Sequence, residues 1–128
     1  MRLLLDTCAL LWFAEDAEQL SARARVLLDD EENEVFVSVA SYWEIVIKFH
    51  KGRLALPCQP DVWFASAIHA DAVLPVDLLD VTALHALGPP TGHKDPWDRL
   101  LAATALRHAL TVVTSDGAFS TYGVPVEW

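Results

Sequence analysis

The sequence predicts an α/β domain in which a mostly parallel sheet of about five strands is covered by helices on both faces. Three observations carry this prediction. Strand-like and helix-like segments alternate along the chain, which is the pattern of such folds. The apolar runs at 2–5 and 110–114 lack polar alternation, as expected of strands buried on both faces. The 128 residues, 53% of them hydrophobic and 21% charged, suffice for one core, so residues 1–128 are interpreted as a single domain.

The first half of the chain is predicted to contain two strands and three helices. In order, they are a strand over 2–5, a helix over 9–14, a helix over 21–30, a strand over 34–39 and a helix that starts at Ser41. Asp6 ends the first strand, and Ser21 can cap the second helix. Ser41 followed by Glu44 ahead of an apolar run is typical of a capping box, which gives Glu44 an ordinary structural role.

The second half continues the alternation. Its predicted elements are a helix over 61–71, a strand over 73–76, a helix over 80–87, a helix over 96–109, a strand over 110–114 and a final edge strand over 124–128. Pro75 favours an edge position for its strand, because proline donates no ladder hydrogen bond. The helix at 96 has a clear start: Asp95 can be its N-cap, Pro96 suits the first position, and Asp98 lies where a carboxylate favours the helix dipole.

The charge balance restricts the function classes. The formal net charge is −9, which argues against a broad basic face for nucleic acid unless some acids bind metal or the cations are locally concentrated. Lys48, His50, Lys51 and Arg53 do cluster. The two cysteines have no CxxC or histidine-rich neighbourhood, which favours free thiols in a reducing cytoplasm, and no apolar run is long enough to span a membrane.

Four acids are predicted to reach one edge of the sheet. Asp6 and Asp116 follow strands, while Glu44 and Asp98 are placed in the first turns of helices. Each has an ordinary role as a cap or turn residue, but four carboxylates held together would repel one another. A hard cation removes that cost, and an all-carboxylate site suits Mg²⁺ or Mn²⁺. Such a site favours phosphodiester hydrolysis by a metal-activated water. The sequence shows no Gly-rich phosphate loop and no serine–histidine or cysteine–histidine constellation.

The ordered set of motifs around these acids suggests a family. The motifs are Leu5-Asp6-Thr7, Trp43-Glu44-Ile45, Asp95-Pro96-Trp97-Asp98-Arg99-Leu100-Leu101-Ala102-Ala103-Thr104-Ala105 and Val113-Thr114-Ser115-Asp116. In this order and spacing, over nearly the whole chain, they resemble PIN-domain nucleases and more narrowly the VapC-type toxins of bacterial and archaeal toxin–antitoxin pairs. Trp97 departs mildly from the pattern, since a smaller aromatic residue is expected there.

The resemblance implies a PIN-like three-layer sandwich and Mg²⁺- or Mn²⁺-dependent cleavage of RNA. Carried over by position, the catalytic and metal-binding set is Asp6, Glu44, Asp98 and Asp116, with Asp95 as a candidate outer member and Thr7 and Ser115 as supporting hydrogen-bond donors. Asp6 and Asp98 would hold the principal ion. The resemblance also implies a cognate DNA-binding antitoxin, which holds the toxin inactive, and a homodimer. The acidic surface fits a basic partner.

RNA would be bound through backbone phosphates and unpaired bases. The candidate phosphate contacts are Arg99 and the group Lys48, Lys51 and Arg53. Unpaired bases are read by stacking and edge contacts, and Trp12, Trp43 and Trp97 lie near the acids in sequence. Tryptophans beside apolar runs are more often core or interface residues, so both interpretations stay open for them.

Other classes of protein are weighed against this prediction. A non-catalytic metal- or RNA-binding PIN-like module can share every residue named. A phospho-acceptor signalling domain needs adjacent acids after the first strand and a lysine after the last, whereas Thr7 and Cys8 follow Asp6 and no lysine follows Lys94. An aspartate-nucleophile phosphatase needs an Asp-x-Asp pair after the first strand, which is absent.

Overall fold

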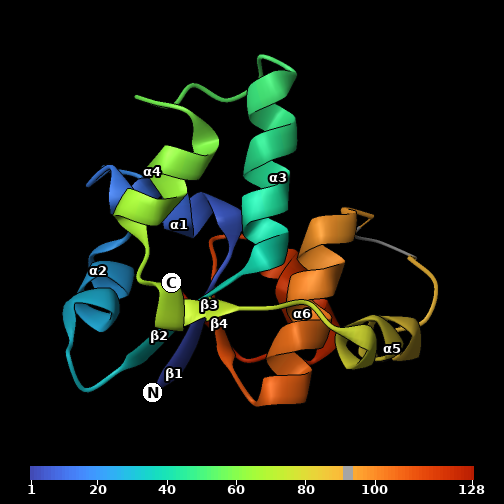
Figure 1. The fold of residues 1–128 in the computed structure, drawn as a ribbon. Helices are drawn as coiled ribbons and strands as arrows, with labels where there is room; N and C mark the ends of the chain where they lie inside the picture. Colours follow the sequence, from blue (N-terminus) through green and yellow to red (C-terminus); the bar gives the residue numbers. More distant parts are fainter. Residues whose placement is uncertain (91–93) are drawn as a thin grey trace.

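The strands form one five-stranded sheet in which every neighbouring pair is parallel (Figure 1). In chain order they are β1 (Arg2–Leu5), β2 (Glu34–Ser38), β3 (Val73–Leu74), β4 (Thr111–Val113) and β5 (Val126–Glu127). Their spatial order is β3-β2-β1-β4-β5, so β1 is central and β3 and β5 are the edges. The structure is a computed structural model that describes residues 1–90 and 94–128. His93, a lone histidine near the start of the helix at 96, lies outside the described residues.

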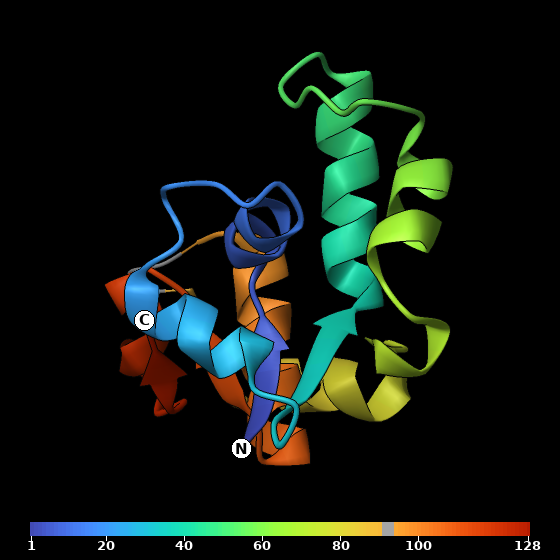
Figure 2. The same cartoon turned by 90° about the vertical axis from the view of Figure 1, so that its left-hand side faces the viewer.

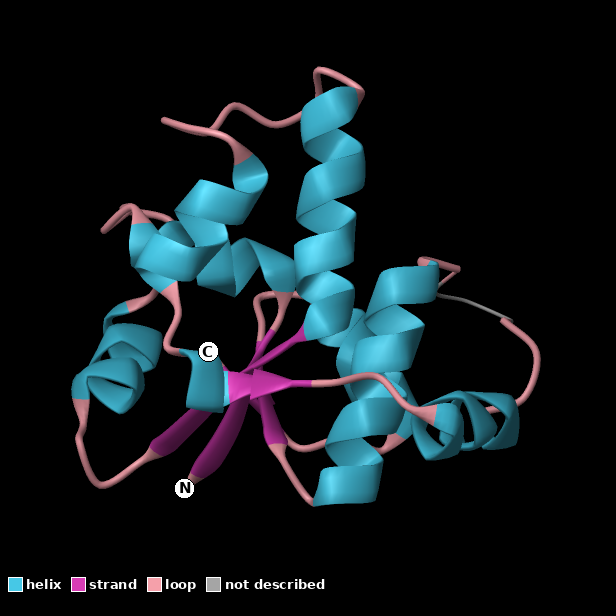
Figure 3. Ribbon diagram, in the orientation of Figure 1, coloured by secondary structure: helices cyan, strands magenta, loops and turns pink. Residues whose placement is uncertain are grey.

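Helices surround this sheet (Figure 3). They are α1 (Thr7–Ala14), α2 (Ala22–Asp29), α3 (Val39–His50), α4 (Pro60–Ala67), α5 (Leu78–Ala86) and α6 (Pro96–His108), with short 3₁₀ helices η1 (Ala70–Ala72) and η2 (Gly117–Tyr122). No described helix has the length and apolarity needed to cross a membrane.

The central strand β1 divides the core into two layers, because successive strand residues point to opposite faces. Leu3 and Leu5 are buried with residues of α1, α2 and α4. Leu4 is buried with residues of α6 and η2 on the other face. Figure 2 shows helices on both sides of the strands. The predicted α/β sandwich with a parallel sheet covered on both faces is therefore confirmed.

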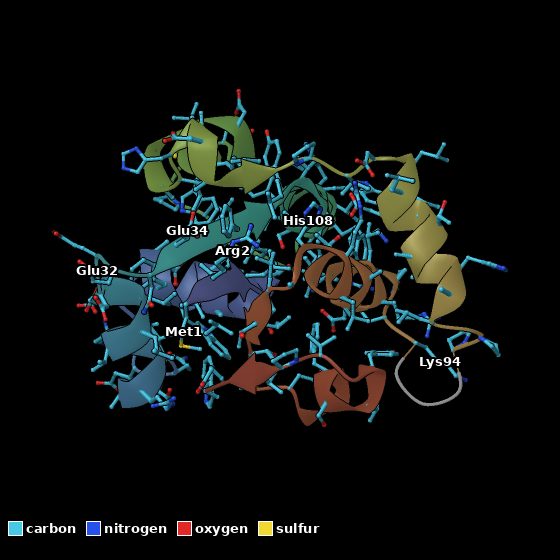
Figure 4. The ribbon with its side chains drawn as sticks, turned by 90° about the horizontal axis from the view of Figure 1, so that it is seen from below. Met1, Arg2, Glu32, Glu34, Lys94 and His108 are labelled. Carbon is cyan, nitrogen blue, oxygen red and sulfur yellow. The ribbon has the colours of Figure 1, made fainter. Side chains whose placement is uncertain are left out.

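The amino-terminal edge of the sheet is closed by polar contacts, seen from below in Figure 4. Arg2 lies 3.4 Å from the carboxylate of Glu34, and its Nη1 donates to the backbone carbonyl of His108 at 2.7 Å. The chain ends of the strands on this side are thus tied to each other and to the end of α6. The opposite, carboxyl edge is where the predicted acids follow the strands.

Three predicted helix starts are wrong by two residues each, and the cause is a capping residue further upstream. Helix α3 begins at Val39, because Ser38 at the end of β2 accepts a hydrogen bond from the Ala40 N–H at 3.0 Å. The capping box from Ser41 to Glu44 does not form, and Glu44 lies in the second turn rather than the first. Helix α5 likewise starts at Leu78, two residues before the predicted start, because Asp77 caps it.

The end of one predicted helix, one unpredicted turn and the start of the first helix also differ. The helix predicted over 61–71 is α4 followed by the separate turn η1, and η2 after β4 was not predicted. The helix predicted from Ala9 starts at Thr7, with Asp6 as its N-cap. The predicted caps Ser21 and Asp95, and proline at the first position of α6, are confirmed.

Candidate metal centre

One cavity at the carboxyl edge of the sheet collects the predicted acids. It has a volume of about 270 Å³ and is called the acidic cavity below. Its lining residues are Asp6, Thr7, Cys8, Glu44, Lys48, Asp95, Asp98, Ser115 and Asp116. They come from the ends of β1 and β4, from the amino-terminal halves of α1 and α6, and from the middle and last turn of α3. Four segments that are far apart in the sequence therefore meet where ligands bind in parallel α/β sheets.

Asp6 is the most constrained of these acids. Its Oδ1 accepts a hydrogen bond from the Ala9 N–H at 2.7 Å, and its Oδ2 accepts one from the Thr114 hydroxyl at 2.5 Å. Burial raises the pKa of Asp6 above its ordinary value; the two hydrogen bonds act against this, and the negative charges of Glu44 and Asp116 add to it. A cation in the cavity would relieve both the desolvation and the repulsion.

Glu44 is held by two donors, one from α1 and one from the next turn of α3. The Thr7 hydroxyl donates to Oε1 at 2.7 Å, and the Lys48 ammonium, one helical turn further along α3, donates to Oε2. Burial lowers the pKa of Lys48, but the hydrogen bond and attraction of Glu44 outweigh it and hold the pKa above its ordinary value. Lys48 is thus a fixed positive charge inside the cavity.

Asp95, Asp98 and Asp116 border the cavity from the starts of two helices. Asp95 Oδ1 accepts hydrogen bonds from the N–H groups of Trp97 at 2.9 Å and of Asp98 at 3.1 Å, so Asp95 is the N-cap of α6. Asp98 occupies the third position of that helix. Asp116 caps η2, where its Oδ1 accepts from the Ala118 N–H at 2.9 Å. Each acid keeps its structural role while lining the cavity.

Two hydroxyls bond to acids of the set: Thr7 donates to Glu44, and Thr114 donates to Asp6. Ser115 is exposed and lines the cavity, and its support role stays a prediction. Sequence reasoning missed Thr114, although the pairing of Leu5 with Val113 places the next residues, Asp6 and Thr114, side by side. Cys8 was also missed as a lining residue; burial and the charge of Asp6 raise the pKa of its thiol.

The predicted phosphate contacts separate into two groups. Lys48 lines the cavity, whereas Lys51 and Arg53 are exposed beyond the end of α3 and are not among its lining residues. Arg99 points elsewhere: its Nη2 donates to the carbonyl of Gly88, and its guanidinium lies 5.6 Å from the centre of the Tyr122 ring. The structure therefore brings one of the four predicted cations to the acids.

The lining residues suit a hard cation by their chemistry. Five carboxylates face one ammonium group among the described lining residues, and every candidate ligand is an oxygen donor apart from the Cys8 thiol. Within residues 1–90 and 94–128, no three Asp, Glu, His or Cys side chains are already grouped as metal ligands. The bonded oxygens of Asp6 and Glu44 keep lone pairs for a further partner, since each carboxylate has about four acceptor positions.

The fold and the site together define an α/β protein with an acidic ligand site at the carboxyl edge of a parallel sheet. The chain belongs to the PIN domain family, whose model matches residues 3–125. It is similar to the ribonuclease VapC22 of Mycobacterium tuberculosis, with 28% identity over 114 residues that cover 88% of this chain and 85% of the relative.

Solved structures agree with this assignment. The chain is similar to a chain of the FitAcB crystal structure from Neisseria gonorrhoeae, with a TM-score of 0.70, 25% identity, and coverage of 97% of this chain and 95% of the other. It also matches VapBC2 from Rickettsia felis, solved with a DNA fragment from its promoter, with a TM-score of 0.71 and coverage of 99% and 98%. At 14% identity, that second likeness concerns the fold.

Proposed function

We propose that the protein is a VapC-type endoribonuclease that depends on Mg²⁺ or Mn²⁺ and acts as the toxin of a toxin–antitoxin pair. One observation supports this above the others: Asp6, Glu44, Asp98 and Asp116 line one cavity in which Lys48 is the single cation among the described lining residues. The similarity to a ribonuclease VapC and to VapBC complexes points to the same activity.

The chain's own residues have distinct roles in this proposal. Asp6 and Asp98 hold the ion, and Glu44 and Asp116 complete its surroundings directly or through water. A bound Mg²⁺ or Mn²⁺ supplies an activated water and stabilises the leaving oxygen of the phosphodiester. Bringing a third carboxylate onto one ion requires side-chain rotation, since the described acids are not yet grouped as ligands.

Two hydroxyls and one ammonium group prepare this site. Thr114 and Thr7 orient Asp6 and Glu44 through the hydrogen bonds described above. Lys48 binds a phosphate oxygen of the RNA beside the ion, because its ammonium has three donors and Glu44 takes one of them. Asp95 caps α6 and lies outside the set of acids that hold the ion.

The partners follow from the same proposal. A cognate antitoxin inhibits the toxin, and a basic antitoxin segment fits a chain whose formal net charge is −9. The proposal also includes a homodimer of single domains spanning residues 1–128. The exposed free thiols of Cys8 and Cys58 favour a reducing compartment, the cytoplasm.

The first experiment is cleavage of a mixed RNA pool by the purified chain with Mg²⁺, with Mn²⁺ and with chelator. The variants Asp6→Asn and Asp98→Asn should lose activity by at least about 100-fold, since even outer groups at metal sites are worth 10–100-fold. Asp71→Asn is the matched control, because Asp71 is an exposed acid on η1 outside the cavity. Circular dichroism confirms that each variant folds.

The outcomes separate the proposal from its rivals. Metal-dependent cutting that D6N and D98N abolish and D71N retains supports the nuclease and its two central ligands. Binding of Mn²⁺ by the wild-type chain without cleavage of any RNA favours a non-catalytic module. No binding of either ion would overturn the metal centre and return each acid to its capping role.

A further inference from the structure

A pair of tryptophans stands next to the acidic cavity. Trp43 on α3 and Trp97 on α6 meet edge to face, with ring centres 5.6 Å apart and planes at 74°. The two helices pack against each other (Figure 1). Trp97 is half-buried, but Trp43 is 56% exposed. Trp97 is thus partly packed into the protein, whereas more than half of Trp43 is accessible to solvent.

The sequence neighbours of both tryptophans line the acidic cavity. Trp43 immediately precedes Glu44, and Trp97 lies between Asp95 and Asp98, all three of which line the cavity. Lys48, whose side chain is 40% exposed, is one turn from Glu44 on the same helix. The contact of the two rings, and the hydrogen bond of 2.9 Å from the backbone N–H of Trp97 to Asp95 Oδ1, place Trp43 near the first turn of α6 beside the cavity.

The contact that Trp97 makes with Trp43 involves its ring and not its indole N–H. Its indole N–H is buried and has no hydrogen-bond partner among the described residues, which is unfavourable for a buried donor. The ring, in contrast, supports Trp43 in an edge-to-face contact of the favoured geometry. Trp43 is therefore held in place although it is mostly exposed.

We propose that Trp43, held by Trp97, stacks a nucleobase of single-stranded RNA beside the bond that is cut. This inference rests on the proposed ribonuclease function and names a binding site for its substrate. Unpaired bases stack on exposed aromatic rings, and the adjacent backbone phosphate needs a cation, which Lys48 supplies. Stacking one nucleotide here places its neighbouring phosphate over the acids.

A protein partner fits a different surface better. Leu79 of α5 and Leu106 of α6, both exposed large apolar residues, line one open groove between these helices. Trp43, in contrast, contacts Trp97, whose backbone N–H binds the cavity acid Asp95. Charged surroundings disfavour the apolar centre of a protein interface, whereas a nucleotide offers both a ring and a charge.

The test combines a side-chain change with a base deletion. Cleavage of a short single-stranded RNA is measured with Mg²⁺, and abasic nucleotides are scanned around the cut. For the wild-type chain, one abasic position should lower kcat/KM about tenfold, because a stacked base is worth a change of this order. For Trp43→Ala, kcat/KM should be lower by about the same factor, mainly through KM, and the abasic nucleotide should have no further effect.

Two further variants serve as controls. Trp43→Phe keeps an aromatic face and should retain most of the wild-type kcat/KM. Leu79→Ala removes an exposed apolar side chain on α5 and should behave as the wild type at every abasic position. Circular dichroism and gel filtration monitor folding and oligomeric state.

Each contrary outcome has a distinct meaning. If W43A cuts every RNA as the wild type does, the stacking site is refuted and the nuclease is retained. If W43A converts a dimer to a monomer, Trp43 is a contact between copies and the inference is equally wrong. If the wild-type chain binds metal but cuts no RNA, the proposed function is wrong, and so is this inference, which rests on it.

Discussion

Two acidic clusters in this molecule shift the pKa of a carboxyl group in opposite directions. In the acidic cavity, five carboxylates share Lys48, and the pKa of Asp6 is raised by burial and by neighbouring acids. In the second cluster, between α5 and α6, Arg107 Nη1 lies 2.6 Å from Asp77 Oδ1 and 2.9 Å from Asp80 Oδ1. There the backbone hydrogen bond of Asp80 and the ion pair with Arg107 lower the pKa of Asp77.

The difference shows how a structural acid can be told from a functional one. The α5–α6 cluster is complete: Asp80 is fully buried, accepts the Asp77 N–H at 3.0 Å in a capping box, and also lies 3.6 Å from His108. In the acidic cavity, Asp6 is repelled by Glu44 and Asp116, and Lys48 is the one cation among the described lining residues. Removing an acid should therefore destabilise the α5–α6 cluster, whereas removing the charge of Asp6 should relieve repulsion in the acidic cavity.

The largest expected effect on stability is in the α5–α6 cluster. Asp80→Ala removes the buried half of the capping box and leaves Arg107 with one partner, which should lower the free energy of unfolding by about 2–4 kcal/mol. Asp6→Asn should not lower it, because ionised Asp6 is repelled by Glu44 and Asp116. Urea unfolding followed by circular dichroism compares the two, and RNA cleavage by the folded fraction should persist in D80A. Equal losses of stability would contradict the contrast between the clusters.

Metal addition should stabilise only through the acidic cavity. An ion that binds the folded chain alone raises the free energy of unfolding by about 2.7 kcal/mol at 100 times its Kd. Thermal unfolding with increasing Mg²⁺ or Mn²⁺ should show a rising Tm for the wild type and for Asp77→Asn, and little rise for D6N. An equal rise in D6N would place the ion elsewhere on the molecule.

A smaller effect is expected from the hydroxyl that supports Asp6. Thr114→Val keeps the shape of the side chain but removes the donor to Asp6 Oδ2, which should cost about 1–2 kcal/mol of unfolding free energy and reduce cleavage. Thr82→Val is the matched control, since Thr82 is exposed on α5 and is not among the residues that line the acidic cavity. Unchanged cleavage in T114V would show that Asp6 needs no orienting bond.

Much of this architecture is readable from local chemistry. The apolar run at β1, the caps Ser21 and Asp95, and the proline that starts α6 all act within a few residues, so the sequence predicts them. The four acids were also predicted to share one edge, because parallel strands and the helices that follow them meet there.

The errors have a common physical source, namely choices between neighbouring polar residues. Ser38 and Ser41 are both acceptable caps, and only the end of the β2 ladder decides that Ser38 takes the Ala40 N–H. Thr114 and Ser115 are both hydroxyls next to Asp116, and only strand register turns Thr114 toward Asp6. The pairing of Lys48 with Glu44, and of Arg99 with Gly88, likewise depends on tertiary contacts.

The pH dependence of stability gives the finest test, and its expected sign differs between the clusters. A raised folded-state pKa means that ionised Asp6 destabilises the fold. The free energy of unfolding of the wild type therefore falls as pH rises from the ordinary value of 3.8 through the raised pKa. The lowered pKa of Asp77 has the opposite consequence: its stabilisation is present above 3.8 and is lost as pH falls through the folded-state value.

The variants D6N and D77N isolate these charges, because asparagine caps a helix about as well as aspartate. With chelator present at neutral pH, D6N should be more stable than the wild type and D77N less stable, the latter by a small amount since Asp77 is exposed. The D6N difference should vanish as the pH of urea unfolding is lowered below 3.8, where the Asp6 carboxyl is protonated in both the folded and the unfolded chain. The D77N difference should vanish only as the pH falls through the lowered folded-state pKa of Asp77. Two differences of the same sign at neutral pH would show that Asp6 is as well neutralised as Asp77, and the need for an external cation would disappear.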